Sequence, residues 1–367
     1  MHNSSRQTPA NQVRRQQIRN ENALQNHRWL KCMDEFKDFF INAPTSFPQT
    51  VKDQQLSLTP IKIALIDDGI DTTHKDLQGR VVGGQCFCDD ESSSFYVSAG
   101  GHGTMMARLI ARVFPKAQIL SLKLDEHSQS DGRSQFSVQS ATEAIRWARE
   151  YGVSIINMSW SIEKTDTNKG SSFKDLANAV QDANTAGILM FCSNNDRGET
   201  KDNSYPGRGP AIKIGAGTAM GAKYHYVSTD NIDFLFPGRV VEKEQDEEVA
   251  ENAGAGPRNR SADGSSLATA FASGLAGLIL YMLRLTSFHC WSGAIRSDKA
   301  VLYTKVAEDP MLMKMVFEKM KSSAGFVEVW KSFHGVEDKV RTSGRGPVPR
   351  LKVMEKICED LTSEIRI

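Results

Sequence analysis

Between residues 61 and 217 the chain alternates short apolar runs with longer stretches of helix-forming residues. Each apolar run has the length of a strand, and such runs are typical of strands that are buried on both faces of a sheet. Strands that alternate with helices indicate β-α-β units, so the pattern predicts an α/β fold with a mostly parallel central sheet flanked by helices. We expect strands at residues 61–66, 119–124, 154–158, 188–192 and 211–214, and helices that begin near His102, Ser137 and Ser172.

The two ends of the chain have patterns that differ from this central region. Apolar residues such as Trp29, Met33 and Phe36 recur every three or four positions, which predicts an amphipathic helix that packs on the rest of the protein. The polar residues before it predict a disordered or loosely attached arm. After residue 285 helical patterns dominate, and Asp309 followed by Pro310 marks a helix start. The predicted parts are an N-terminal arm and helix (1–55), a central α/β domain (56–285) and a helical C-terminal extension (286–367).

Two further stretches interrupt the alternating pattern. Residues 237–264 look irregular and include the acidic run 242–251, so we expect an exposed loop there. The acidic run is either a solvated surface without a role, which exposed charge runs commonly are, or a feature that favours peptides with basic side chains. Residues 267–283 carry no charge, but the run is short for a membrane span and contains small and polar residues such as Ser273 and Gly274. The sequence therefore favours a buried helix of a soluble protein over a membrane span.

Charge and cysteine content narrow the class of protein. The 367 residues include 45 basic and 44 acidic side chains, a formal net charge of +1, so no overall field attracts nucleic acid or an anionic membrane. Six cysteines without CxxC spacing favour neither a disulfide framework nor a zinc site, and they fit a reducing compartment. The first twenty residues lack the apolar segment of a secretory signal, so we expect a cytoplasmic or otherwise intracellular protein.

Three side chains that could act together in nucleophilic catalysis occupy places where the predicted elements begin or end. Asp67 follows the first predicted strand, where its carboxylate can orient a histidine. His102 lies between two glycines at a predicted helix start, and Ser266 begins the apolar run, where helix N–H groups stabilise an oxyanion. Their neighbours Asp68 and Ser265 are interpreted as a turn residue and a helix cap. The order Asp67, His102, Ser266 therefore predicts a catalytic triad.

This order of residues, together with several short motifs, resembles the subtilases, a family of serine proteases. The motifs are IALIDDGIDTTHKDL, GHGTMMARLI, IINMSWS, YPGRGP and DGSSLATAFASG, and they cover about residues 60–285. The resemblance implies a subtilisin-like three-layer α/β fold and a serine endopeptidase that acts on a polypeptide substrate. Asp67 would then support His102, which takes the proton of Ser266 as Ser266 attacks a peptide carbonyl and forms an acyl-enzyme. The absence of a signal makes the chain similar to intracellular protease-like domains of fungal multidomain proteins.

The resemblance also implies where a peptide would bind. Ser159, Trp160 and Ser161 look like the strand edge on which the family holds extended peptides through backbone hydrogen bonds. Trp160 is bulkier than the residue expected at that position, so the shape of the pocket is left open.

Two positions depart from the family pattern. Ala270 replaces the proline that usually follows the nucleophile motif, and an alanine inside a helix is harmless. The asparagine of the oxyanion hole usually lies in a turn after a strand, where this chain reads CSNNDRG up to Gly198. Counting from the strand selects Asn195, and counting back from Gly198 selects Asp196. We favour Asn195, because an amide donates a hydrogen bond to an oxyanion and an ionised carboxylate repels it.

Two other classes of function compete with a protease. A catalytically inactive module that binds peptides or partners would keep the same fold, so the fold alone does not separate the two. An α/β-hydrolase esterase would need a GxSxG motif, but Ala268 stands where the second glycine belongs, and the acidic residue and the histidine precede the serine. We expect no cofactor and assign no metal ligand, although calcium is frequent in the family, because no DxDxDG-like loop is present. The sequence leaves the oligomeric state open.

Overall fold

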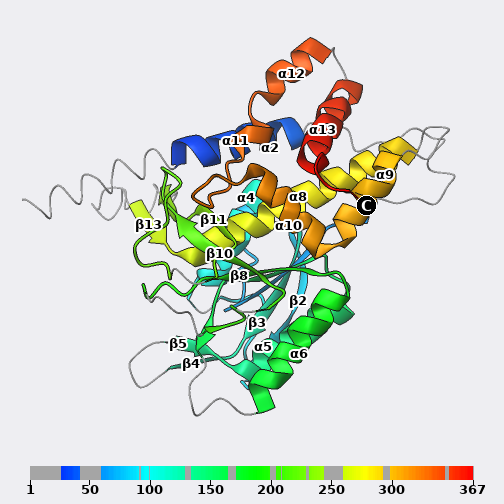
Figure 1. Ribbon diagram of the computed structural model, residues 1–367. Coiled ribbons are helices and arrows are strands. Elements are labelled where there is room, and N and C mark those ends of the chain that lie inside the picture. The colour runs from blue at the N-terminus through cyan, green and yellow to red at the C-terminus, as the bar shows by residue number, and fades with distance from the viewer. Residues whose placement is uncertain are drawn as a thin grey trace, which may run out of the picture.

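A seven-stranded sheet forms the centre of the protein, which is shown as a computed structural model in Figure 1. The structure describes residues 26–41, 59–90, 92–98, 100–128, 134–163, 171–198, 204–207, 209–228, 231–243, 259–291, 298–343 and 347–366. All neighbouring strands of this sheet are parallel, in the order β11-β10-β8-β6-β1-β3-β2, which confirms the predicted α/β fold. The strands are β1 (Lys62–Asp67), β2 (Val81–Phe87), β3 (Gln118–Leu124), β6 (Ile155–Met158), β8 (Leu189–Ser193), β10 (Ile212–Gly217) and β11 (Phe234–Pro237).

Helices cover both faces of the sheet and complete the predicted three layers. Side chains alternate between the two faces along β1: Ile63 and Leu65 join the apolar cluster around α4 and α8, while Ala64 and Ile66 join the cluster around α5 and α6. Because both faces are buried, β1 reads as a nearly continuous apolar run in the sequence. The four helices are α4 (His102–Val113), α5 (Val138–Glu150), α6 (Ser171–Thr185) and α8 (Ser265–Trp291).

The direction in which the chain adds strands to the sheet reverses at β1. The chain first places β2 and β3 on one side of β1 and then crosses to add β6, β8, β10 and β11 on the other side. In open parallel sheets, ligands bind at such a reversal, in the crevice outside the carboxyl ends of the strands. Here the crevice lies beyond Asp67 at the end of β1 and Met158 at the end of β6.

The five predicted strands agree with β1, β3, β6, β8 and β10, but the strand β2 was not predicted from the sequence. Gly83 and Gly84 interrupt its apolar pattern, and glycine is usually unfavourable within a strand. Gly84 has a packing reason to be there, because a Cβ at this position would lie 2.6 Å from the ring of Phe95. A local pattern contains no sign of this contact with a distant loop.

The expectation of an irregular loop at residues 237–264 is wrong at both ends of that segment. There β12 (Arg239–Lys243) and β13 (Asn259–Asp263) pair as antiparallel strands. The segment β13 reads NRSAD, which has no alternation of apolar and polar residues, so the pattern could not reveal it. Residues 244–251, which hold most of the acidic run, and the polar arm before residue 26 lie outside the described residues. The other short ladders join β4 (Glu126–Ser128) to β5 (Ser134–Phe136) and β7 (Ile162–Glu163) to β9 (Ser204–Tyr205).

The amphipathic helix predicted near the N-terminus packs into the apolar core as α2 (Lys31–Ile41), directly after the π-helical turn η1 (Asn26–Leu30). Phe36 is fully buried, and its ring centroid lies 4.8 Å from that of Phe333 in the C-terminal part of the chain. The carboxylate of Asp34 also accepts a partly buried hydrogen bond from Arg112 of α4 at 2.7 Å. The N-terminal helix therefore docks against both the α/β region and the C-terminal helices.

The chain after α8 is helical, as the sequence predicts. Asp309 begins α10, and its carboxylate accepts a hydrogen bond from the Met311 N–H at 2.8 Å. One apolar cluster contains residues of α2, α8 and α13, and the division of the chain after residues 55 and 285 stays a prediction. The helices of this part are α9 (Asp298–Glu308), α10 (Pro310–Met320), α11 (Trp330–Phe333), α12 (Val336–Ser343) and α13 (Pro347–Thr362).

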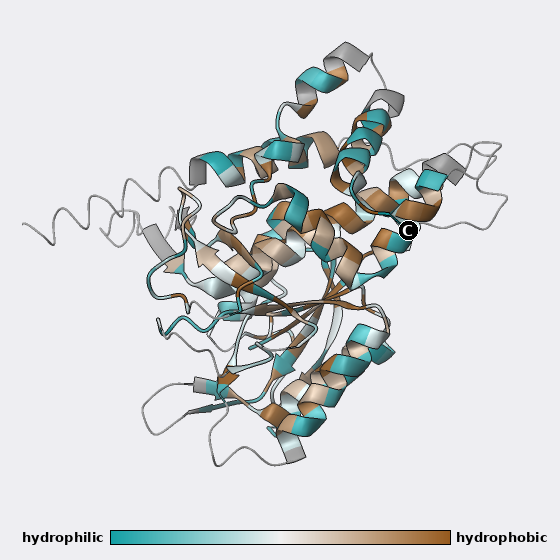
Figure 2. Ribbon diagram, in the orientation of Figure 1, coloured by the Kyte–Doolittle hydropathy of each residue, from teal (hydrophilic) through white to brown (hydrophobic). Residues whose placement is uncertain are grey.

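In the part of the chain that the structure describes, α8 is the one helix long and apolar enough to cross a membrane. The apolar window within Ser265–Phe288 is 94% buried inside the protein, against the sheet on one side and α9 and α13 on the other. Figure 2 shows hydrophobic residues along α8, whereas α5 and α6 carry hydrophilic residues on their outer faces. These features fit the buried helix that was expected at residues 267–283.

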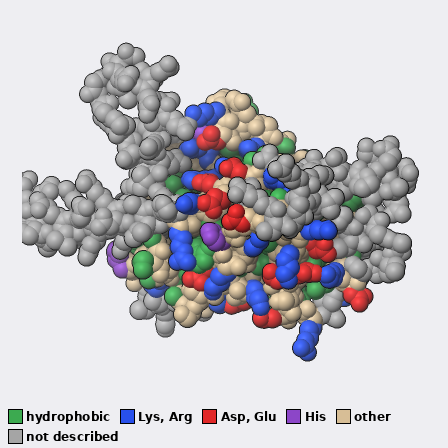
Figure 3. Space-filling view, turned by 90° about the horizontal axis from the view of Figure 1, so that it is seen from above, with side chains coloured by type: hydrophobic (Ala, Val, Ile, Leu, Met, Phe, Trp, Pro, Cys, Tyr) green, Lys and Arg blue, Asp and Glu red, His purple; other side chains and the backbone are tan. Residues whose placement is uncertain are grey.

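Figure 3 shows the face near the terminal helices, where acidic and basic side chains are intermingled. Ion pairs on the C-terminal helices include Lys356 with Asp360 at 3.0 Å and Lys299 with Glu359. Such exposed pairs contribute little stability each.

Candidate active site

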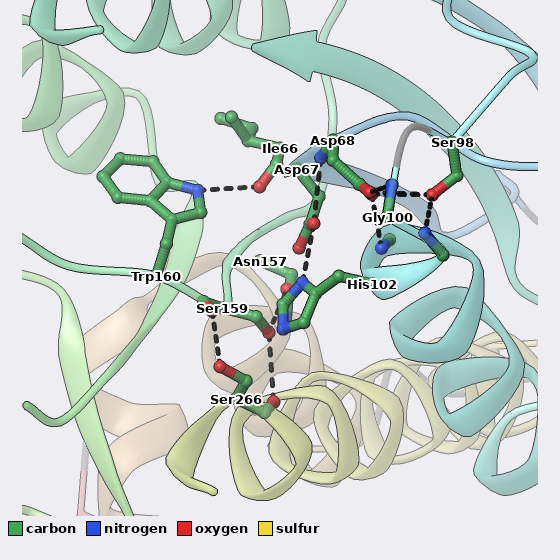
Figure 4. Close-up of polar contacts among 12 residues, drawn as sticks. Ile66, Asp67, Asp68, Ser98, Gly100, His102, Asn157, Ser159, Trp160 and Ser266 are labelled. Atoms are coloured by element: carbon green, nitrogen blue, oxygen red, sulfur yellow. Dashed lines mark hydrogen bonds and ion pairs between the residues drawn. The ribbon is translucent and has the colours of Figure 1, made fainter. Parts of the chain in front are cut away.

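The three residues of the predicted triad lie on elements that meet at the crevice beyond β1 and β6 (Figure 4). Asp67 is the last residue of β1 and is 1% exposed. His102 is the first residue of α4, and Ser266 lies in the first turn of α8. Because α4 packs on both β1 and α8, the fold brings these three distant segments of the chain to one edge of the sheet.

Asp67 and His102 are in direct contact. Nδ1 of His102 lies 2.7 Å from Oδ1 of Asp67, and the same oxygen accepts the backbone N–H of Asp68 at 2.9 Å. A carboxylate can only accept hydrogen bonds, so Nδ1 carries the proton in this contact. The other oxygen of Asp67, Oδ2, is buried and has no partner among the described residues.

The pKa values of Asp67 and His102 are both raised above their ordinary values. The carboxylate of Asp67 raises the pKa of His102 to about 9, although burial of the imidazole opposes this effect. Burial raises the pKa of Asp67, and the charge of His102 works in the opposite direction. The contact therefore stabilises the protonated imidazole, and His102 becomes neutral only at alkaline pH.

Ser266 does not form a hydrogen bond with His102 in the described structure. Its hydroxyl donates to the carbonyl oxygen of Ser159 at 2.7 Å. In Figure 4 the free edge of the imidazole is turned towards Ser159 and Ser266. A protonated imidazole offers no acceptor to a hydroxyl, so this arrangement is the one expected while His102 is charged.

The segment after β6 is fixed to α8 by Ser159 together with Asn157, a residue that sequence reasoning missed. The hydroxyl of Ser159 lies 2.8 Å from Oδ1 of Asn157 and 3.1 Å from the carbonyl oxygen of Ser266. The amide of Asn157 in turn donates to Ser273 Oγ of α8 at 2.8 Å. Asn157 is fully buried, so these contacts hold the strand end and the serine-bearing helix in register.

The side chain of Trp160, a predicted substrate-binding residue, points into the core and away from the crevice. It is 6% exposed, its indole N–H donates to the Ile66 carbonyl at 2.7 Å, and its ring packs edge-on against Phe136. The bulk that seemed out of place in the sequence therefore fills space beneath β1. Ser161 is partly exposed, and neither its backbone nor that of Trp160 has a hydrogen-bond partner among the described residues.

The two residues considered for the oxyanion hole lie in different surroundings. Asp196 is exposed at the start of α8, where its carboxylate accepts the N–H of Ser265 at 2.7 Å and the hydroxyl of Ser265 at 2.6 Å. Asn195 is 5% exposed, and its carbonyl oxygen accepts the N–H of Ser228 at 3.1 Å. Ser265 is thus the helix-start residue the sequence suggests, but its partner is a carboxylate from another loop.

A second buried carboxylate lies beside the triad. Asp68 is 4% exposed and accepts hydrogen bonds from Ser98, Gly100 and Gly103, which surround His102 in the chain. The sequence offered one signal for this residue, the doubled aspartate before Gly69, which was interpreted only as a turn.

Metal ligands do not gather in the described residues, since no three His, Cys, Asp or Glu side chains come together there in a way that could hold an ion. The five cysteines whose side chains the structure describes form no disulfide with one another: Cys32, Cys86, Cys88, Cys192 and Cys358.

The chain shares sequence with known serine proteases. It is 28% identical over 218 residues to the major intracellular serine protease of Bacillus subtilis (strain 168), covering 55% of this chain and 63% of that protein. It is 28% identical over 198 residues to an intracellular serine protease of Paenibacillus polymyxa, covering 49% of this chain and 57% of that protein. The chain thus spans less than two thirds of the length of these relatives.

Solved structures support the assignment of the fold. The crystal structure of a lanthipeptide protease superposes with a TM-score of 0.57 at 18% identity, covering 76% of this chain and 89% of that one. At this identity the likeness concerns the architecture alone. The model of the subtilase family matches residues 59–291, which include the whole sheet, α4 and α8. The chain therefore belongs to the subtilase family, as its motifs indicated.

Proposed function

We propose that this chain is a serine endopeptidase in which Asp67, His102 and Ser266 form the catalytic triad. The observation that carries the proposal is the 2.7 Å contact between Asp67 and His102 at the crevice where α8 also presents Ser266. A buried carboxylate on Nδ1 leaves Nε2 as the nitrogen that exchanges a proton with Ser266. Membership of the subtilase family supports the same roles.

The proton transfers follow from the charge of His102. When the imidazole loses its Nε2 proton, the Ser266 hydroxyl gains an acceptor and can leave the Ser159 carbonyl. As Oγ bonds to the peptide carbonyl carbon, its proton passes to Nε2 and the carbonyl oxygen becomes an oxyanion. Collapse breaks the C–N bond, Nε2 gives its proton to the leaving amine, and water releases the acyl group by the same steps.

The oxyanion needs hydrogen-bond donors on the side of α8. The N–H of Ser266 lies in the first helical turn, where the helix itself supplies no acceptor, so it can serve as one donor. We assign the second donor to the amide of Asn195. Both oxygens of Asp196 already accept hydrogen bonds from Ser265, which fits a capping role for that carboxylate.

We place the substrate along the segment Ser159–Trp160–Ser161. The backbone groups of Trp160 and Ser161, which have no hydrogen-bond partner among the described residues, can pair with an extended peptide as an added strand. Because the Trp160 side chain is directed into the core, recognition here would rest on the backbone and would tolerate varied peptide sequences.

A serine-reactive fluorophosphonate probe tests the proposal. The protein should be labelled on Ser266 at pH 9, and Ser266→Ala should abolish labelling while the fold, followed by circular dichroism, is retained. Ser265→Ala is the matched control, because it removes the neighbouring hydroxyl and should leave Ser266 reactive. Labelling that survives in Ser266→Ala would refute the assignment, and no labelling of any variant would favour the inactive peptide-binding module.

We also propose an intracellular location for the protein. Two of its relatives are named as intracellular serine proteases, and the described cysteines form no disulfide with one another. Fractionation of cells that express the protein with a small tag should find it in the soluble intracellular fraction. Recovery from the medium would contradict this proposal.

A further inference from the structure

The carboxylate of Asp68 is buried beside the predicted triad, and three donors close to His102 in the chain form hydrogen bonds with its two oxygens (Figure 4). Oδ1 accepts the N–H of Gly103 at 2.7 Å, and Oδ2 accepts the N–H of Gly100 at 2.7 Å. The hydroxyl of Ser98 donates to both oxygens, at 2.9 Å and 2.8 Å. A buried charge is stable only when it is hydrogen-bonded in this way, so the carboxylate orders Ser98, Gly100 and Gly103 and they in turn stabilise its charge.

Further contacts fix the backbone next to His102. Ser98 Oγ also accepts the N–H of Gly101 at 2.8 Å, and Gly101 adopts φ 79°, a conformation that favours glycine. A Cβ on Gly103 would lie 2.9 Å from Oδ1 of Asp68, so the first turn of α4 rests directly on the carboxylate. His102 lies between two residues, Gly100 and Gly103, whose N–H groups Asp68 holds.

We propose that Asp68 is a positioning residue that fixes His102 by holding the backbone on both sides of it. Asp67 then contacts the imidazole itself, and Asp68 sets where the imidazole stands relative to Ser266. The consequence for Ser266 rests on the proposed function, whereas the placement of His102 can be measured without it.

The charge of Asp68 gives this role a distinct signature. The groups that raise the pKa of His102 are Asp67 above all, then Asp68 and Glu126, while burial lowers it. Lys123 of β3 is the register partner of Asp67 on β1. Its ammonium group donates to the Val97 carbonyl at 3.0 Å and so holds the backbone next to Ser98. Removing the negative charge of Asp68 should therefore lower the pKa of His102, because the imidazolium loses a stabilising neighbour.

Two arginine side chains of α4 are engaged in ion pairs. Arg108 pairs with Asp76 at 3.0 Å, and Arg112 pairs with Asp34 at 2.7 Å, both further along the helix than His102. At the start of α8, Asp196 is held by Ser265. A change in the titration of His102 upon replacement of Asp68 would thus report on Asp68 itself.

The test compares Asp68→Asn and Ser98→Ala with the unmodified protein by two measurements. Histidine-labelled NMR gives the titration midpoint of His102, assigned with His102→Gln, and fluorophosphonate labelling at the alkaline plateau gives the reactivity of Ser266. Asp68→Asn should lower the midpoint and slow labelling by roughly 10- to 100-fold, because small misplacements of reacting groups cost this much. Ser98→Ala keeps the charge, so it should slow labelling by a smaller factor and leave the midpoint near its original value.

Asp90→Asn is the matched control. Asp90 holds Ser92 through hydrogen bonds to the hydroxyl at 2.7 Å and 2.8 Å, as Asp68 holds Ser98, but it lies on the surface. Asp90→Asn also removes one negative charge, but it should change neither the titration midpoint of His102 nor the labelling rate of Ser266.

An Asp68→Asn protein that keeps the original titration midpoint of His102 and the original labelling rate of Ser266 would overturn the inference. A lower midpoint with an unchanged labelling rate would also overturn it, because Asp68 would then act on His102 through its charge alone. If Asp68→Asn fails to fold, the labelling rate of Ser98→Ala is the test. A rate below that of the unmodified protein supports the positioning role of Asp68, and an unchanged rate overturns it. If the unmodified protein is never labelled, the proposed function fails. The titration midpoints and the imidazole signals measured by NMR would still show whether Asp68 orders His102.

Discussion

The pH dependence of Ser266 reactivity follows from the raised pKa of His102. With a pKa of about 9, the neutral share of His102 is about 1% at pH 7, about 10% at pH 8 and about 50% at pH 9. Only neutral His102 can take the proton of Ser266, so the rate of the acylation step is proportional to this share. The labelling rate should therefore rise about tenfold from pH 7 to pH 8 and about fiftyfold from pH 7 to pH 9.

The assay is the second-order rate of fluorophosphonate labelling from pH 6 to pH 10, corrected for hydrolysis of the probe. Asp67→Asn should move the midpoint down, because the carboxylate is the largest cause of the raised pKa, and burial then lowers it further. The same variant should lose roughly 10⁴-fold in peptide turnover. A profile of the unmodified protein with its midpoint near 6.5, the ordinary value for histidine, would refute the electrostatic reasoning.

Three further predictions concern the oxyanion turn, the strand edge and the N-terminal helix. Asn195→Ala should lower turnover by roughly 10²-fold or more with little change in KM, whereas Asp196→Asn should do little; acceleration by Asp196→Asn would show that its carboxylate faces the oxyanion. Trp160→Phe removes a buried hydrogen bond and should destabilise the fold by about 1–3 kcal/mol in urea, while an effect on KM alone would mean that Trp160 contacts substrate. Phe36→Ala should cost about 3–5 kcal/mol in the same assay, and the exposed Ile41→Ala should cost little; equal effects would contradict the docking of α2.

The fold could be predicted from the sequence wherever burial is complete. β1 and β8 are buried over nearly their whole length, so each reads as an apolar run, and both were found within one residue of their observed bounds. β2 and β13 could not be found this way. Their side chains are partly exposed or polar, and long-range pairing with β3 and β12 decides their conformation.

The candidate site was predictable as a set of residue types but not as a set of contacts. Motif order identified Asp67, His102 and Ser266, because each follows or begins a recognisable element. The orientation of Trp160 and the hydrogen bond of Ser266 to Ser159 depend on what surrounds them in three dimensions. A local pattern cannot distinguish a carboxylate that ends a turn from one that holds a distant backbone segment, so the contacts of Asp68 required the structure.

The most direct test of the account is the digestion of an unfolded protein substrate at pH 9, with the products read by mass spectrometry. The unmodified chain should release internal fragments, and Ser266→Ala, at equal concentration and with the same circular dichroism spectrum, should release none. Equal digestion by both proteins, or intact substrate with a folded and unmodified chain, would contradict the claim that this subtilase cleaves peptide bonds through Ser266.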